Sequence, residues 1–146
     1  MNISPHFTLA EATITSQRNP ATGQRYDNQP DNDQDLATIR RTADKMEAIR
    51  ELFGNRPVIV NSWYRNTEVN KAVGGVPDSQ HKLGEAVDFN IKGLSHDDVV
   101  SYLRGKMVEL GIDQLILEPT WVHVSFRTSR AGGVPRNQYL DLSKRG

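Results

Sequence analysis

The sequence contains two histidines and one aspartate whose spacing allows their side chains to bind one metal ion. His81 lies seven residues before Asp88, and His123 follows in a separate stretch of alternating apolar and polar residues. Imidazole nitrogens and carboxylate oxygens are common zinc ligands, and a site with three protein ligands keeps a fourth position for water. Such a site lowers the pKa of the bound water to about 7 and polarises a carbonyl group. This chemistry is hydrolysis.

Two predicted strands carry Asp88 and His123. Side chains alternate between the two faces of a strand, so Asp88 points away from its core-forming neighbours Val87 and Phe89. The same alternation places His123 opposite Val122. If the two strands are neighbours in the sheet, the carboxylate and the imidazole converge.

The turn before the first of these strands contains Gly84, which allows a tight reversal and can bring His81 to the same point. Hydrolysis also needs a general base, and Glu118, five residues before His123, is the best-placed acid. Spacing alone leaves two other interpretations open. The side chains can be merely solvated or hydrogen-bonded, or the same ligand types can hold ferrous iron in an oxygenase.

The composition is that of one soluble globular domain covering residues 1–146. The chain is 36% apolar and 25% charged, and its 146 residues can bury a core without a disulfide or a structural metal. Eighteen basic and eighteen acidic residues cancel, so we expect no nucleic-acid partner. The protein is expected to be a monomer. Because cysteine is absent, thiolate metal sites, cysteine nucleophiles and disulfides are excluded.

Neither a membrane span nor a signal peptide is predicted. No apolar run approaches the length of about 18 residues that a spanning helix needs. The N-terminus lacks a basic start followed by an apolar stretch. We therefore expect the protein to be made in the cytoplasm and to need release before it can act outside.

The order of elements predicts an α+β fold, with a small, mostly antiparallel sheet flanked by helices. Apolar residues recur at three- and four-residue steps from Leu36 to Phe53, which predicts a helix that starts after Asn32 and ends at Gly54. Other helices are predicted near residue 9, at 67–73 and between Ser95 and Gly111. Strands are predicted at 57–63, 86–91, 113–118 and 121–126. Residues 15–33 are expected to form a long surface loop and residues 127–146 an irregular tail.

Ordered motifs in the chain resemble those of the zinc D-alanyl-D-alanine carboxypeptidase-like peptidases. The pattern SxHxxGxAxD over residues 79–88 and the pattern WxH over 121–123 are similar to that family's metal signature. Segments 61–66 (NSWYRN) and 70–75 (NKAVGG) resemble its Ser-Gly-Tyr-Arg-Ser block and the continuation of that block. Segments 113–116 and 121–125 fit the version found in small phage-type members. The resemblance runs from about Phe7 to Phe126.

The resemblance implies a hedgehog/D,D-peptidase-like fold and a Zn²⁺ ion bound by His81, Asp88 and His123. It also implies that Arg65 binds a substrate carboxylate or stabilises the oxyanion of the tetrahedral intermediate. A fixed guanidinium with several donors suits either anion. The family includes D,D-dipeptidases and bacteriophage peptidoglycan endopeptidases.

Two positions depart from the family pattern. Trp63 replaces the glycine of the Ser-Gly-Tyr-Arg block. Many relatives place the catalytic glutamate three residues before the last histidine, where this chain has Thr120. Glu118 instead stands at a spacing similar to that of the phage-type subgroup, and we expect it to act as the base.

Besides Arg65, the side chains of Ser79, Gln80 and Trp121 are expected to bind the substrate. Ser79 and Gln80 can donate hydrogen bonds to the substrate or to the metal ligands. Trp121 and Trp63 can line a cleft, with buried packing expected for at least one of them.

The sequence therefore predicts a zinc metallopeptidase that acts on peptidoglycan stem peptides or crosslinks. It can be a D,D-carboxypeptidase or an endopeptidase of the endolysin type, and a bacteriophage or prophage origin fits that interpretation. The alternative is a zinc-stabilised module without catalysis, which binds the cell wall, a virion component or another protein.

Overall fold

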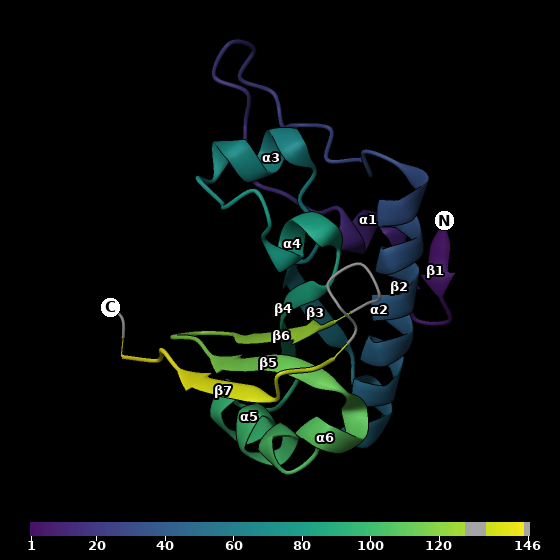
Figure 1. Ribbon diagram of the computed structural model, residues 1–146, viewed down its shortest axis with the longest axis vertical. Helices are drawn as coiled ribbons and strands as arrows, with labels where there is room; N and C mark the ends of the chain where they lie inside the picture. Colours follow the sequence, from purple (N-terminus) through teal and green to yellow (C-terminus); the bar gives the residue numbers. More distant parts are fainter. Residues whose placement is uncertain (128–133, 145–146) are drawn as a thin grey trace.

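A computed structural model describes residues 1–127 and 134–144 (Figure 1). Its main sheet has five strands in the order β3-β4-β6-β5-β7. The strands are β3 (Val58–Ser62), β4 (Ala86–Ile91), β5 (Ile112–Leu117), β6 (Val122–Phe126) and β7 (Gln138–Asp141). Neighbouring strands are antiparallel except β5 and β7, which are parallel. The sheet is therefore mixed, and the prediction of a mostly antiparallel sheet is matched only in part.

β7 was not predicted, because it lies in the tail that the sequence indicated to be irregular. The main-chain N–H of Arg136 donates to the Asp113 carboxylate over 2.7 Å, and the Asn137 side-chain amide donates to the Ile112 carbonyl over 2.8 Å. These bonds place the tail beside β5. Residues 128–133 and 145–146 of the predicted tail lie outside the described residues.

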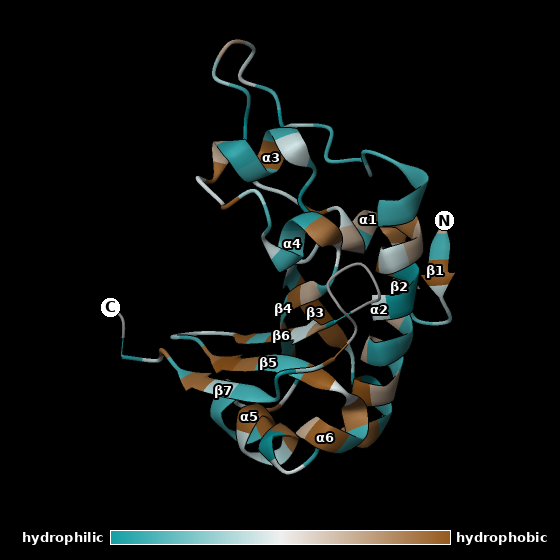
Figure 2. Ribbon diagram, viewed as in Figure 1, coloured by the Kyte–Doolittle hydropathy of each residue, from teal (hydrophilic) through white to brown (hydrophobic). Residues whose placement is uncertain are grey.

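The longest helix, α2 (Asp33–Leu52), is the one that the apolar repeat predicted. The Asn32 side chain caps it by accepting a hydrogen bond from the Asp35 N–H. Its buried apolar side chains are Ile39, Ala43, Met46 and Ile49. Each large apolar side chain buried in this way contributes about 1.5–3 kcal/mol. In Figure 2 the brown segments of α2 alternate with teal ones, as expected for a helix with one buried face.

Two helices, α5 (His96–Arg104) and α6 (Met107–Leu110), pack against β5 at the lower end of the molecule in Figure 1. Ser95 caps α5 as expected, with its hydroxyl accepting from the Asp98 N–H. The sequence predicted one helix here, but the chain interrupts it between Arg104 and Met107. The buried residues of both helices belong to the same hydrophobic core as those of α2 and the sheet.

The N-terminus forms a two-stranded antiparallel sheet of β1 (Asn2–Ser4) and β2 (Phe7–Thr8), followed by α1 (Leu9–Ala12). Thr8 and Glu11 form the capping box that the sequence indicated at the start of α1. Residues 13–32 contain no helix or strand beyond an isolated bridge between Arg18 and Arg25. Two short helices, α3 (Thr67–Ala72) and α4 (Gln80–Leu83), separate β3 from β4.

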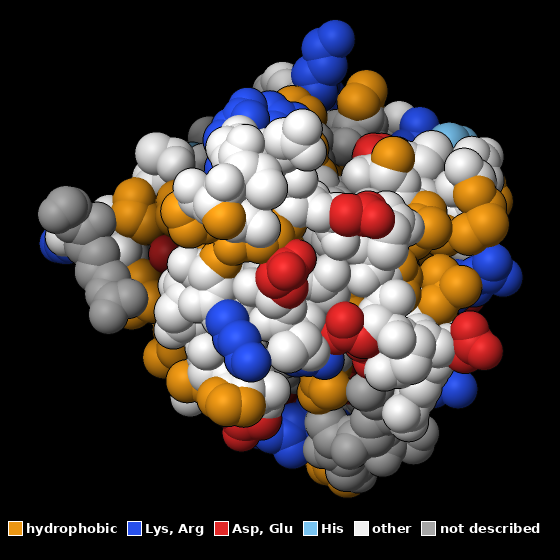
Figure 3. All heavy atoms as spheres, turned by 90° about the horizontal axis from the view of Figure 1, so that it is seen from above, with side chains coloured by type: hydrophobic (Ala, Val, Ile, Leu, Met, Phe, Trp, Pro, Cys, Tyr) orange, Lys and Arg blue, Asp and Glu red, His pale blue; other side chains and the backbone are white. Residues whose placement is uncertain are grey.

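None of the helices described within 1–127 and 134–144 is long and apolar enough to cross a membrane. On the face drawn in Figure 3, Lys and Arg side chains are scattered among acidic and neutral ones. This face therefore offers no continuous basic surface.

Candidate metal centre

The turn between α4 and β4 brings His81 back over the strand that carries Asp88. Ser79 caps α4, with its hydroxyl accepting from the His81 N–H over 3.2 Å. Gly84 ends the helix at a φ of 83°, in the left-handed region that favours glycine. A Cβ added there would lie 2.9 Å from Cγ1 of Ile39. Glycine is thus needed both for the reversal and for the close approach to α2.

The imidazole of His81 is held in one orientation. Its Nδ1 lies 2.6 Å from the main-chain carbonyl oxygen of Trp63. A carbonyl only accepts hydrogen bonds, so Nδ1 carries a proton, and Nε2 is the ring nitrogen left to bind a metal. Nε2 lies 3.4 Å from Oδ2 of Asp88. A backbone partner of this kind is typical of metal-binding histidines.

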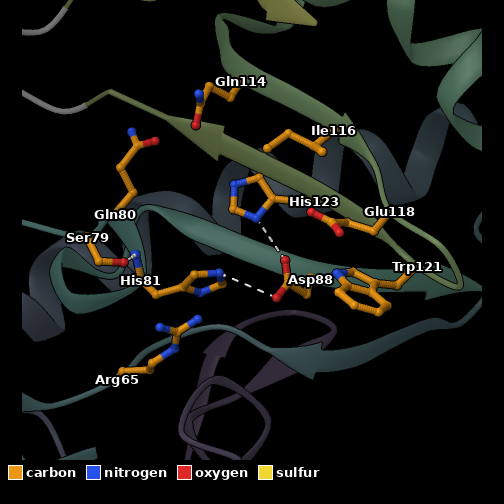
Figure 4. Close-up of a pocket in the computed structure, with 10 residues that line it drawn as sticks. All are labelled: Arg65, Ser79, Gln80, His81, Asp88, Gln114, Ile116, Glu118, Trp121 and His123. Atoms are coloured by element: carbon orange, nitrogen blue, oxygen red, sulfur yellow. Dashed lines mark hydrogen bonds and ion pairs between the residues drawn. The ribbon is translucent and has the colours of Figure 1, made fainter. Parts of the chain in front are cut away.

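Asp88 and His123 meet across two neighbouring strands, as the alternation predicted. They are direct partners in the antiparallel pairing of β4 and β6, so their side chains share one face. Nδ1 of His123 lies 2.8 Å from Oδ1 of Asp88 (Figure 4). One ligand atom from each of His81, Asp88 and His123 lies within 4.8 Å of the others. This spacing allows the three side chains to hold one metal ion.

The electrostatics of the cluster favour a cation. Burial raises the pKa of Asp88, but hydrogen bonds and charge attraction from His123 and His81 outweigh this effect and hold that pKa well below its usual range. The carboxylate is therefore ionised at neutral pH, which is the form that binds metals. Burial lowers the pKa of Arg65, and the negative charge of Asp88 opposes that shift.

A cavity of about 360 Å³ opens over the three side chains (Figure 4). All residues that the sequence analysis predicted as metal ligands, catalytic residues or substrate-binding residues line this cavity. The described lining residues are Arg65, Ser79, Gln80, His81, Asp88, Gln114, Ile116, Glu118, Trp121 and His123.

Glu118 and Trp121 flank the hairpin turn that joins β5 to β6. The Glu118 N–H donates to the Trp121 carbonyl over 3.1 Å. Among the described lining residues, Glu118 and Asp88 are the only acids. Thr120, at the usual family position of the base, is exposed and does not line the cavity.

The two tryptophans differ in their surroundings. Trp121 lines the cavity, whereas Trp63 is fully buried and its ring meets that of Phe7 edge to face at 5.9 Å. The indole N–H of Trp63 donates to the Gly84 carbonyl over 3.2 Å. Trp63 therefore belongs to the core beneath the turn.

Gln114 and Ile116 also line the cavity, although the sequence analysis did not select them. Alternation along β5 places both on the face of Glu118, and this signal was present in the sequence. The side chain of Gln80 is held in place by a hydrogen bond, because its amide donates to Asp113 over 3.0 Å. That contact spans 33 residues and has no local sequence signal.

Comparison with known proteins agrees with this geometry. The Peptidase M15 family matches residues 5–125, which include all residues lining the cavity. A zinc D-Ala-D-Ala carboxypeptidase from Streptomyces albus G is 39% identical over 45 residues. That alignment covers 31% of this chain and 18% of the relative, so the chain matches less than a fifth of the relative's length. Because the family match spans most of the described fold, the chain belongs to the peptidase M15 family.

Proposed function

We propose that this protein is a zinc metallopeptidase that cleaves peptide bonds in peptidoglycan stem peptides or crosslinks. The observation that carries the proposal is the cluster of His81, Asp88 and His123, whose ligand atoms lie within 4.8 Å of one another at the floor of a cavity. Two imidazoles and one carboxylate fit a zinc ion that keeps an open position. The name of the similar carboxypeptidase supports both the metal and the class of substrate.

The side chains around the cluster fit the steps of amide hydrolysis. His81, Asp88 and His123 would hold the zinc ion, which would supply an activated water molecule and polarise the scissile carbonyl. Glu118 accepts a proton at its carboxylate and returns it to the leaving amine. Arg65 stabilises negative charge on the carbonyl oxygen or binds a substrate carboxylate. Ser79, Gln80 and Trp121 line the cavity and orient the peptide.

The protein would act on the bacterial cell wall after release from the cytoplasm, as a monomer. This activity fits that of an endolysin encoded by a bacteriophage or a prophage.

The first test compares metal content with activity. Zinc-loaded protein and its His81→Ala, Asp88→Ala and His123→Ala variants are incubated with defined muropeptides, and the fragments are identified by mass spectrometry. We expect the variants to lose zinc and to release no fragments. Full activity in a variant or in metal-stripped protein would overturn the proposal.

A second test separates an enzyme from a binding module. Glu118→Gln keeps the shape of the side chain but removes the base, so we expect retained zinc and a fall in kcat of about 10²–10⁴-fold. A wild type that binds zinc and leaves every muropeptide intact would support a zinc-stabilised module instead. Purification with iron rather than zinc, and turnover of an oxoacid, would support an oxygenase.

A further inference from the structure

A second cavity adjoins the metal centre on the side of Arg65. Its volume is about 210 Å³, and it shares Arg65 and Asp88 with the first cavity. Figure 4 shows Arg65 and Gln114 on opposite sides of the cluster formed by His81, Asp88 and His123. The first cavity therefore extends toward Gln114, and the second continues past Arg65.

Segments that are distant in sequence line the second cavity, and α3 and its C-cap add Val69 and Val73 to its wall. Thr15, Ser16 and Gln17 follow α1, and Asn61 and Ser62 end β3. All five side chains are neutral and can form hydrogen bonds. This lining suits the amide groups of a peptide better than a carboxylate.

A main-chain hydrogen bond joins two of the segments that line the second cavity. The Tyr64 N–H donates to the Ala12 carbonyl over 2.9 Å, which holds the chain after α1 against the end of β3. Residues 14–17 and residues 61–62, which flank this bond in the sequence, both line the cavity. β3 is also an outer strand of the sheet. The edge of an outer strand is a common place for an extended peptide to bind.

Two exposed aliphatic side chains also line the second cavity. Ile14 is 46% exposed and Val73 is 40% exposed, and both line the cavity. Exposed aliphatic side chains of this kind can cover the alkyl part of a bound peptide side chain.

The charge distribution distinguishes two kinds of peptidase. A carboxypeptidase holds the free carboxylate of its substrate with a cation where the pocket ends. Arg65 is the only cation among the described residues that line either cavity, and both cavities share it. It therefore lies where the cavities join, and neutral polar walls continue beyond it.

We propose that the second cavity is a subsite for substrate residues beyond the scissile bond, so that the protein cleaves within a peptide or crosslink. The inference rests on the proposed peptidase function. Water adds its hydroxyl to the acyl carbon and a proton to the leaving amine as the amide bond breaks. The leaving amine would carry further peptide into the space between residues 14–17 and residues 61–62.

The test compares two defined muropeptides as substrates of the zinc-loaded full chain. One is a monomer that ends in D-Ala-D-Ala. The other is a crosslinked dimer in which the D-Ala carbonyl is joined to an amine of a second stem peptide. We expect kcat/KM for the dimer to exceed that for the monomer by about tenfold or more, because only the dimer reaches the second cavity.

Variants that narrow the second cavity test its role directly. Asn61→Trp should lower the dimer-to-monomer ratio of kcat/KM by about tenfold. Gln17→Trp, in the other of these two segments, should do the same and provides an independent variant if the first misfolds. Ile59→Trp is the matched control, since Ile59 is 50% exposed on the same strand and lines neither cavity. Circular dichroism and zinc content establish that each variant is folded.

The outcomes separate the inference from the proposed function. Release of terminal D-Ala alone, or an unchanged ratio in folded Asn61→Trp and Gln17→Trp, overturns the subsite and leaves the peptidase standing. Failure of the zinc-loaded wild type to cleave either muropeptide overturns both.

Discussion

The orientation of His81 depends on a single buried tryptophan. The Trp63 carbonyl accepts from Nδ1 of His81, and the Trp63 indole N–H donates to the carbonyl of Gly84. That carbonyl also accepts from the Thr42 hydroxyl over 2.8 Å. One residue thus fixes both the histidine ring and the turn that carries it. This is a physical reason for a large side chain where the family block has glycine.

We expect Gly84→Ala to destabilise the protein and weaken zinc binding. Alanine is strained at a φ of 83°, and its Cβ would lie 2.9 Å from Cγ1 of Ile39. Strain and overpacking together predict a loss of about 2–4 kcal/mol in the free energy of unfolding. Because the turn positions His81, zinc affinity should fall by about tenfold. Urea unfolding and zinc titration measure the two effects.

Gly54→Ala is the matched control for this substitution. Gly54 has a φ of 71°, but no atom lies within 4 Å of an added Cβ. We expect backbone strain of about 1–2 kcal/mol and unchanged zinc affinity. Equal losses of zinc affinity in the two variants would show that the turn does not position His81.

At the scale of elements, the central strands and the capped helices were predictable, whereas α4 and β7 were not. Alternation in 86–91 and 121–126 placed Asp88 and His123 on one face, and the pairing of β4 with β6 joins them. α4 has only four residues, too few to show a helical period, so the approach of His81 was inferred from Gly84 and from the family resemblance. β7 is equally short and depends on contacts of Arg136 with a distant strand, which no local pattern encodes.

The contact between the tail and β5 should contribute to stability. Asp113 is fully buried, and the Arg136 guanidinium binds both of its carboxylate oxygens over 2.7–3.2 Å. We expect Arg136→Ala to lower the free energy of unfolding by about 1–3 kcal/mol, because it removes charged hydrogen bonds from a buried carboxylate. Arg40→Ala, on an exposed position of α2, is the control and should change it by less than about 0.5 kcal/mol. Urea unfolding that gives equal values for both variants would contradict the role of Arg136.

The same contact should make stability depend on pH. Burial raises the pKa of Asp113, but hydrogen bonds from Arg136 and Gln80 outweigh this and lower the pKa. Stability from the ionised carboxylate is therefore complete above the unfolded pKa of about 3.9 and is lost as pH falls through the lower folded value. The difference in free energy of unfolding between wild type and Asp113→Asn should shrink below about pH 4. A difference that stays constant from neutral to acidic pH would contradict this linkage.

At the scale of the whole molecule, the candidate metal centre joins parts of the chain that only the fold brings together. Its three residues come from α4, β4 and β6. In the unfolded chain they are separated by seven and by 35 residues and form no preorganised site. Zinc should therefore bind the folded state in strong preference and stabilise it by mass action.

We expect a chelator to lower the melting temperature of the zinc-loaded protein. At free zinc 100 times the Kd, the stabilisation is about 2.7 kcal/mol, which corresponds to about 10 °C for a chain of this length. His123→Ala removes one ligand, so its melting temperature should be nearly the same with zinc and with chelator. His96→Ala removes a histidine at the start of α5, outside the cavity, and should keep the full shift. A shift in melting temperature requires zinc to bind the folded state more tightly than the unfolded state. Calorimetry that finds the full shift in His123→Ala would therefore show that zinc binds at a site that does not need His123.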